Sequence, residues 1–125
     1  MTAKTTSHSK GVLAEELAAK QLVGDGYKII ERRYKTKFGE IDLIAQKKDL
    51  IIFVEVKAHY NVSDSLYAVT PRTRRRIEQS ALWFLFENPD YAACDMRFDV
   101  IAFHGDLSSG SIYGEHLDNA WMVGA

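Results

Sequence analysis

The most constraining feature of the chain is an apolar run at residues 50–56 that contains a single charge, Glu55. A run apolar on both alternating faces is typical of a central strand covered on both sides. Residues 38–45 predict a neighbouring strand, and the polar residues 46–49 between the two predict a hairpin turn. The run therefore predicts a sheet with layers on both faces, with Glu55 placed where an uncompensated charge is costly.

The rest of the chain predicts helices and further strands around this hairpin. A helix is predicted over residues 11–25, with an apolar face formed by Leu13, Ala14, Leu17, Ala18 and Leu22. Glu15 falls at the edge of that face and Glu16 in solvent. Pro71 can open a second helix, which Asn88-Pro89 would end near residue 87.

Further strands are predicted at residues 27–34 and 96–103, and edge structure at about 112–123. The order helix, three strands, helix, strand predicts an α/β fold with one mixed β-sheet flanked by helices. We expect a flexible tail over residues 1–10 and a single domain over residues 11–125.

Composition limits the classes of protein. The net charge of −1 does not suit a protein that coats nucleic acid by charge alone. The sequence has no apolar run of the ~20 residues that a membrane span needs, and its first ten residues lack the apolar core of a signal peptide. The single cysteine, Cys94, points to a reducing compartment. These features predict a cytoplasmic protein without a membrane partner.

Charged residues on the predicted hairpin suggest a metal site. Because alternate strand residues share a face, Glu40 and Asp42 should point the same way, and so should Glu55 and Lys57. Carboxylate and carbonyl oxygens suit Mg²⁺ or Mn²⁺, so the predicted ligands are Asp42, Glu55 and the backbone carbonyl of Val56. Lys57 could orient an attacking water or offset charge on the transition state.

Ordinary structural roles remain open for the same residues. Glu55 and Lys57 could form a plain salt bridge, and Asp42 could cap the turn. Glu40 suits a solvated charge as well as a ligand, and Glu15 suits a helix-edge charge as well as part of the acidic cluster. His59, two residues after Lys57, is a minor candidate for a general acid or base.

Two basic clusters could contact phosphates. One joins Arg32 and Arg33 to Lys35 and Lys37; the other comprises Arg72, Arg74, Arg75 and Arg76. Each could be a solvated face, but cations at a helix N-terminus oppose the helix dipole, which favours a purpose such as phosphate binding. The aromatic residues Trp83, Phe84 and Phe86 are predicted as core and helix surface rather than as base-stacking platforms.

The hairpin motifs also resemble a known family. Gly39-Glu40-Ile41-Asp42-Leu43-Ile44 and Phe53-Val54-Glu55-Val56-Lys57 resemble the signature of the YraN family, a bacterial family assigned to the PD-(D/E)XK or Holliday-junction-resolvase-like nuclease superfamily. Weaker matches are Gly11-x-x-x-Glu15 in the first helix, Ala68-Val69-Thr70-Pro71-Arg72 and Arg97-Phe98-Asp99-Val100.

The resemblance implies a restriction-endonuclease-like fold with Asp42, Glu55 and Lys57 as active-site residues and Glu15 as a helix acid. It also implies Mg²⁺ or Mn²⁺, a nucleic-acid substrate and a homodimer. The chain departs from the family at Ala58-His59, where Thr-Arg is usual, and at Thr73, where lysine is usual. These departures put the substrate-contacting rim in question and leave the three active-site residues intact.

Two hypotheses follow for function. The first is a metal-dependent endonuclease that hydrolyses DNA phosphodiester bonds, with a branched substrate suggested only by analogy. The second is a non-catalytic module on the same fold that binds nucleic acid or a protein partner. A third, structural interpretation has a merely salt-bridged acidic cluster, and metal binding would separate it from the other two.

Overall fold

Five strands and two long helices make up most of the described part of the chain. The computed structural model describes residues 7–58, 69–104 and 114–124, with side chains from residue 11 onward. In chain order the elements are α1 (Ser7–Gly24), β1 (Lys28–Thr36), β2 (Gly39–Lys47), β3 (Leu50–Ala58), α3 (Pro71–Glu87), the 3₁₀ turn η1 (Pro89–Tyr91), β4 (Asp95–Phe103) and β5 (Glu115–Trp121).

The strands form one mixed sheet in the order β1-β2-β3-β4-β5. β1, β2 and β3 are an antiparallel meander, β3 and β4 are parallel, and β5 returns antiparallel to β4. A parallel pair needs a crossover connection, and α3 lies in it. The mixed sheet with flanking helices confirms the predicted restriction-endonuclease-like α/β fold, to which β5 adds an edge strand.

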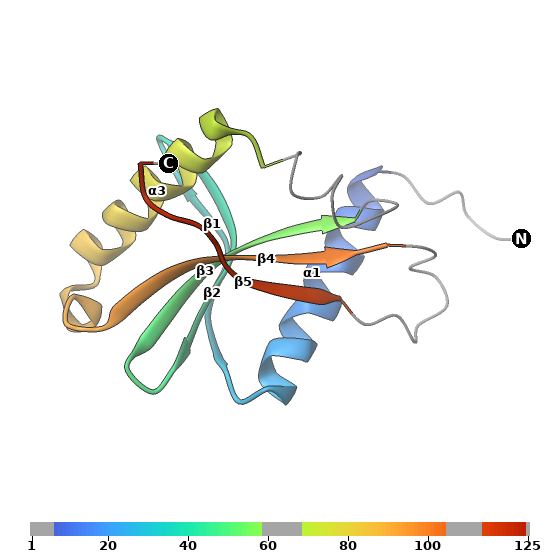
Figure 1. Ribbon diagram of the computed structural model, residues 1–125, viewed down its shortest axis with the longest axis horizontal. Coiled ribbons are helices and arrows are strands. Elements are labelled where there is room, and N and C mark those ends of the chain that lie inside the picture. Colours follow the sequence, from blue (N-terminus) through green and yellow to red (C-terminus); the bar gives the residue numbers. More distant parts are fainter. Residues whose placement is uncertain (1–6, 59–68, 105–113, 125) are drawn as a thin grey trace, which may run out of the picture.

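The two helices cover opposite faces of the sheet (Figure 1). α1 contributes Ala14, Ala18 and Leu22 to one core cluster, where they pack with residues such as Val54. α3 contributes Ile77, Ala81 and Phe84 to the other cluster, where they pack with residues such as Phe53. Neighbouring residues of β3 thus face different layers, which explains why its sequence is apolar throughout.

The ends of α3 are as the sequence predicted. Thr70 caps the helix by accepting a hydrogen bond from the Thr73 N–H (3.3 Å), Pro71 is the first helical residue, and Asn88 ends the helix. The hairpin between β2 and β3 is also confirmed, although its turn is shorter than predicted. Only Lys48 and Asp49 lie between the strands, and Lys48 takes a left-handed φ of 54°.

The α1 prediction was correct in its centre and wrong at its edges. The helix begins at Ser7, four residues before the predicted start. Leu13 was predicted on the apolar face but is 36% exposed, and Ala19 is buried instead. Glu15 is half-buried and Glu16 exposed, as predicted. The predicted loops at residues 61–70 and 105–110 fall almost wholly outside the described residues. Within the described ranges, neither helix is long and apolar enough to cross a membrane.

Candidate active site

The ladder between β2 and β3 stops at the two acidic residues that the sequence singled out. Pairing runs from Lys47–Leu50 to Leu43–Val54 and goes no further. Beyond that point a carboxylate oxygen of Asp42 (Oδ2) accepts the backbone N–H of Val56 at 2.8 Å. β3 continues beside β4 as far as Ala58. The last residues of β3 are therefore paired along one edge and open along the edge facing Asp42.

A local irregularity directs Asp42 to this opening. Arg32 pairs with Leu43 and Tyr34 pairs with Ile41, but the intervening Arg33 and Asp42 do not pair. Arg33 has a left-handed φ of 50°, a conformation that is uncommon for a residue with a side chain. Ile41 and Leu43 then pack on opposite faces of the sheet. The regular alternation that we assumed for Glu40 and Asp42 thus does not hold at this point of β2.

Glu55 is the buried acid of the site, with 8% of its surface exposed. Burial raises the pKa of its carboxyl group well above the usual value, and the hydrogen bond and negative charge of Asp42 raise it further. Lys57 opposes this effect through its positive charge. The raised pKa therefore favours the protonated form of Glu55 beside Asp42.

Val56 and Lys57 complete the open end of β3. The N–H and C=O groups of one strand residue point to the same edge, so the Val56 carbonyl is expected beside its N–H, toward Asp42. Lys57 is half-buried and shares the strand face of Glu55. The structure thus brings together Asp42, Glu55, Val56 and Lys57.

Glu15 approaches this group from α1 but is engaged by an arginine. Its carboxylate accepts a 2.6 Å hydrogen bond from the Nε–H of Arg33. Burial raises the pKa of Glu15, the negative charges of Asp42 and Glu40 add to the rise, and Arg33 opposes it. Glu15 therefore lies within electrostatic reach of both acidic residues of β2. Glu40 itself is exposed, and His59 lies outside the described residues.

Arg33 was predicted only as part of a basic cluster, and its contact with Glu15 was missed. The sequence did carry a signal, since Glu15-Glu16 and Arg32-Arg33 are adjacent pairs of opposite charge. In the structure each arginine of β1 forms a salt bridge with one glutamate of α1: Arg33 with Glu15, and Arg32 with Glu16 at 2.7 Å.

The basic residues of α3 divide into two groups. The Nε–H of Arg74 donates to the carbonyl of Val69 at 2.9 Å, and its guanidinium lies 5.7 Å from the ring centroid of Trp121. Arg74 thus connects the N-terminal end of α3 to β5. The other predicted phosphate contacts, Arg72, Arg75, Arg76 and Lys37, are exposed.

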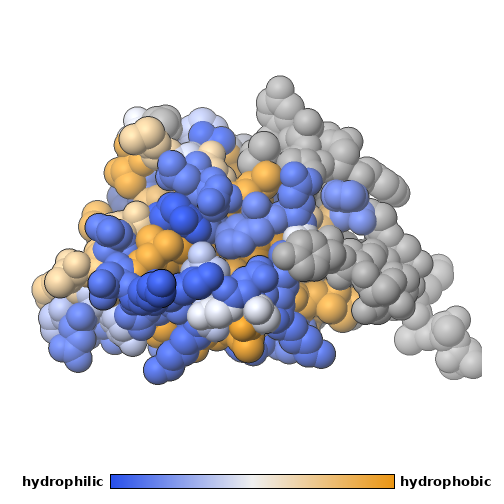
Figure 2. All heavy atoms as spheres, turned by 60° about the horizontal axis from the view of Figure 1, so that its bottom comes forward, coloured by the Kyte–Doolittle hydropathy of each residue, from blue (hydrophilic) through white to orange (hydrophobic). Residues whose placement is uncertain are grey.

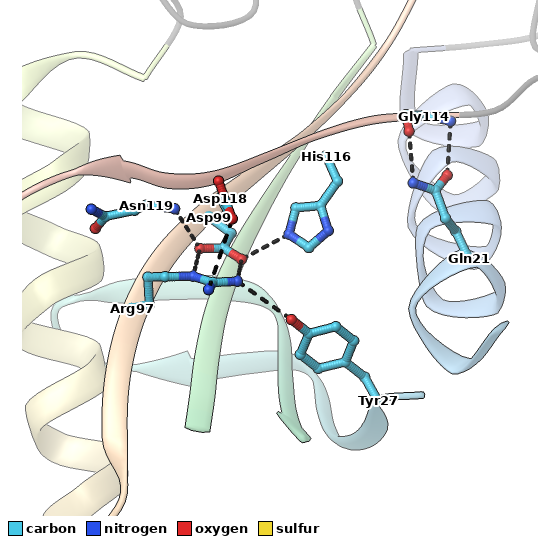
Figure 3. Close-up of polar contacts among 8 residues, drawn as sticks. All are labelled: Gln21, Tyr27, Arg97, Asp99, Gly114, His116, Asp118 and Asn119. Atoms are coloured by element: carbon cyan, nitrogen blue, oxygen red, sulfur yellow. Dashed lines mark hydrogen bonds and ion pairs between the residues drawn. The ribbon is translucent and has the colours of Figure 1, made fainter. Parts of the chain in front are cut away.

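A second charged cluster, centred on Asp99 in β4, was not predicted (Figure 3). The fully buried Asp99 carboxylate accepts two 2.8 Å hydrogen bonds from Arg97, the Asn119 N–H at 2.9 Å, and lies 2.7 Å from Nε2 of His116. Burial would raise the pKa of Asp99, but the hydrogen bonds of Arg97, His116 and Asn119 outweigh it and lower the pKa. The Tyr27 hydroxyl accepts from Arg97 at 3.4 Å. Because His116 and Asn119 belong to β5, this cluster fastens β5 to β4.

The donor groups at the open end of β3 suit a hard divalent cation. Among the described residues no three His, Cys, Asp or Glu side chains form a metal-binding group by themselves. Mg²⁺, however, is commonly held by one or two carboxylates with water completing its shell. Asp42 and Glu55 supply two neighbouring carboxyl groups, and a cation bound there would favour the ionised form of Glu55, which burial disfavours. The Val56 carbonyl is the remaining protein donor.

These features define a class of protein: an α/β fold with a restriction-endonuclease-like sheet and a carboxylate-lysine cluster where two strands separate. The chain belongs to the uncharacterised protein family UPF0102, whose family model matches residues 14–103. This is the YraN family that the motifs resemble, so the predicted membership is confirmed.

The relatives carry the same family name. A UPF0102 protein of Rhodopseudomonas palustris strain HaA2 is 46% identical over 98 residues, which cover 78% of this chain and 77% of the relative. UPF0102 protein RPA0323 of strain ATCC BAA-98 / CGA009 is 48% identical over 99 residues, covering 79% and 76%. A UPF0102 protein of Bradyrhizobium sp. strain BTAi1 is 47% identical over 91 residues, covering 73% and 67%.

One solved structure shows a weak likeness. It is Pyrococcus furiosus SfsA in complex with Ca²⁺, with a TM-score of 0.31 and 17% identity, covering 83% of this chain and 60% of that one. A likeness this low bears neither on the function of this chain nor on its site.

Proposed function

We propose that this protein is a metal-dependent endonuclease that hydrolyses phosphodiester bonds of DNA. The observation that carries the proposal is the meeting of the Asp42 and Glu55 carboxyl groups beside Lys57, at the place where β2 and β3 separate. A buried carboxyl group with a raised pKa, such as that of Glu55, is costly unless it serves a purpose, and such groups concentrate at functional sites. The fold and the family resemblance support the same assignment.

Each residue has a role in this chemistry. Asp42, Glu55 and the Val56 carbonyl would hold Mg²⁺ or Mn²⁺, which when bound polarises a phosphoryl oxygen and lowers the pKa of a bound water. Lys57 would donate hydrogen bonds to the attacking water or to the phosphoryl oxygens as negative charge develops there. The attacking water gives up a proton to solvent as its oxygen bonds to phosphorus, the bond from phosphorus to the leaving sugar oxygen breaks, and that oxygen takes a proton from solvent, so that one water is added in all.

A non-catalytic binding module is the second candidate function. The observation that favours it is the 2.6 Å hydrogen bond between Arg33 and Glu15, which occupies the helix acid that the family resemblance assigns to the site. A module of this kind would bind nucleic acid through the exposed arginines of α3 and release it uncut.

A cleavage assay separates the two functions. Single-stranded, duplex, flap and four-way-junction DNA would be incubated with Mg²⁺ or Mn²⁺ and the native protein, Asp42→Ala or Lys57→Ala. Matched controls are Asp90→Ala and Lys28→Ala, which remove an exposed charge of the same type elsewhere. We expect the native protein and both controls to cleave DNA. In both site variants the cleavage rate should fall by about 100-fold or more, as it does in other enzymes when a group that stabilises charge in the transition state is removed.

Two results would contradict the hydrolase. Cleavage that persists in a folded Asp42→Ala variant would point to a contaminant or another site. Binding without cleavage by the native protein, on every substrate and with either metal, would favour the binding module.

A further inference from the structure

The outward face of α3 joins exposed arginines to exposed apolar side chains. At about 100° per residue, these side chains fall within an arc of about 120°. They are Arg72, Arg75 and Arg76 in the first half of the helix, and Leu82, Trp83 and Phe86 in the second. Ile77, Ala81 and Phe84 occupy the buried side. We call the exposed arc the α3 outer face. The arc contains no acidic residue, so its only charges are those of the three arginines in its first half.

The aromatic half of this face is exposed and ordered by its own contacts. Phe86 is 75% exposed and Trp83 is 36% exposed, and their ring centroids lie 5.5 Å apart at an interplanar angle of 31°. The ammonium nitrogen of Lys37 lies 5.6 Å from the Trp83 ring and 5.3 Å from that of Phe38. The sequence predicted Trp83, Phe84 and Phe86 as core and helix surface, and the structure agrees: Phe84 is core, and the other two lie on the helix surface. Two exposed rings beside a cation can receive nucleic-acid bases, which gain about 1–3 kcal/mol each by stacking on such rings.

The α3 outer face lies next to the start of β2, close in the chain to the candidate active site. A side-chain carbon on Gly39 would lie 3.4 Å from the Cβ of Arg76, and Thr36 hydrogen-bonds Ser80 at 2.8 Å. Gly39 begins β2 only three residues before Asp42. From Arg72 to Phe86 the helix rises about 21 Å, which matches roughly six nucleotides at the ~3.4 Å spacing of a stacked strand.

We propose that the α3 outer face binds a single-stranded segment of the nucleic-acid substrate, with phosphates at the arginines and bases on Trp83 and Phe86. This inference rests on the proposed function and narrows its substrate class to DNA that offers unpaired bases. A duplex hides its base faces within the stack and would engage only the arginines. A second copy of the chain fits less well, because a two-fold interface brings the same patch from both partners and this face has no acid to meet its arginines.

Tryptophan fluorescence tests the proposal directly, since the chain has two tryptophans and only Trp83 is exposed. Oligo(dT) of about 12 nucleotides would be titrated at low salt in EDTA, so that no cleavage occurs. We expect quenching in the native protein and no quenching in Trp83→Leu, in which the buried Trp121 still reports. Fluorescence anisotropy with labelled oligo(dT) should show a loss of affinity of about 5- to 150-fold in Trp83→Leu and in Phe86→Ala.

A control variant tests whether the loss of affinity is specific to the aromatic side chains of α3. Val23→Ala removes an exposed apolar side chain of α1 and should bind like the native protein. Unquenched Trp83, or native affinity in both aromatic variants, would overturn the proposal. A concentration-dependent dimer that Trp83→Leu or Phe86→Ala dissociates would overturn it in favour of a second copy.

The two proposals fail separately. Cleavage of DNA without any effect of Trp83 or Phe86 on binding would remove this inference and leave the hydrolase standing. Stacking on Trp83 in a protein that cleaves nothing would keep this inference and remove the hydrolase.

Discussion

The carboxyl group of Glu55 links the stability of the fold to the candidate chemistry. Its pKa is raised in the folded protein, chiefly by burial and then by Asp42, so ionising it costs folding free energy. The cost is absent below the unfolded-state pKa, near 4.5, and grows as the pH rises toward the folded-state pKa. At neutral pH the protein is therefore destabilised by a group that a divalent cation could neutralise.

Replacing Glu55 by glutamine should stabilise the metal-free protein. The amide carries no charge and can donate to Asp42, so we expect a gain of about 1–3 kcal/mol in the free energy of unfolding at pH 8. Urea denaturation over a pH series would show the gain fading below about pH 4.5. Glu31→Gln, at an exposed position, should show no such pH dependence. A less stable Glu55→Gln variant at pH 8 would mean that Lys57 already compensates the charge.

Asp99 should behave with the opposite sign. Its pKa is lowered, so its contribution to stability is present above the unfolded value of 3.8 and is lost as the pH falls through the folded value. Asp99→Asn leaves Arg97 without its buried partner, and we expect a loss of about 3–5 kcal/mol at pH 7. Asp118→Asn changes a side chain that is 73% exposed and should cost far less. Equal losses in the two variants would contradict this interpretation of the cluster.

Glu55 and Asp99 show which side-chain partners the sequence can predict and which it cannot. Glu55-x-Lys57 and Arg97-x-Asp99 are the same signal, an alternating charged pair inside an apolar strand. The partner of Glu55 was predictable because Asp42 lies across a hairpin. The partners of Asp99 were not, because His116 and Asn119 reach it only through the pairing of β5 with β4.

At the scale of elements, the start of β5 depends on close packing against the sheet. The side-chain amide of Gln21 in α1 bonds both backbone groups of Gly114, at 2.6 Å and 2.8 Å. A Cβ at Gly114 would lie 2.6 Å from a methyl carbon of Ile101 and 2.8 Å from the ring of Phe103. Glycine is therefore the residue that lets β5 approach both α1 and β4 here.

Gly114→Ala should loosen this junction. Because the added carbon meets two buried side chains, we expect a loss of about 1–3 kcal/mol in the free energy of unfolding. Urea denaturation would measure the loss, and hydrogen exchange should show the largest decrease in protection in β5. Gly11→Ala, where a Cβ would meet nothing within 4 Å, is the matched control and should not destabilise the protein. A neutral Gly114→Ala variant would mean that β5 can shift without cost.

Elements with local boundary signals were predicted closely, and others were not. α3 has Pro71 at its start and Asn88-Pro89 after its end, so both of its boundaries were correct. The irregular pairing of β1 with β2 at Arg33 and Asp42 has no such signal in the sequence. The left-handed backbone conformation of Arg33 is specified by its tertiary surroundings. That irregularity breaks the alternation of β2 beside Asp42, so the direction of Asp42 could not be predicted from the sequence.

At the scale of the whole molecule, the site lies where the two layers of the fold contribute to one end of the sheet. α1 and α3 lie on opposite faces of the sheet (Figure 1). Glu15 belongs to α1, and Arg76, which lies beside Gly39, belongs to α3. The face in Figure 2 is mainly hydrophilic, with hydrophobic side chains in separate small patches. The acid pair and the Asp99 cluster are thus the two places, in the described part of the chain, where the apolar strands β3 and β4 hold buried carboxyl groups.

A divalent cation should therefore stabilise the whole fold through this one site. A ligand at tenfold its Kd adds about 1.4 kcal/mol, which for a domain of this size corresponds to a rise in Tm of roughly 3–6 °C. We expect Mn²⁺ to raise the Tm of the native protein and of Asp90→Ala, but not of Asp42→Ala or Glu55→Gln, and EDTA to reverse the rise. The rise should increase from pH 5 to pH 8, because the cation must displace a proton whose pKa on Glu55 is raised. An equal rise in the two site variants would place the cation elsewhere. Equal Tm values with and without Mn²⁺ in every variant would leave the acid pair as a structural feature and favour the structural interpretation over both the endonuclease and the binding module.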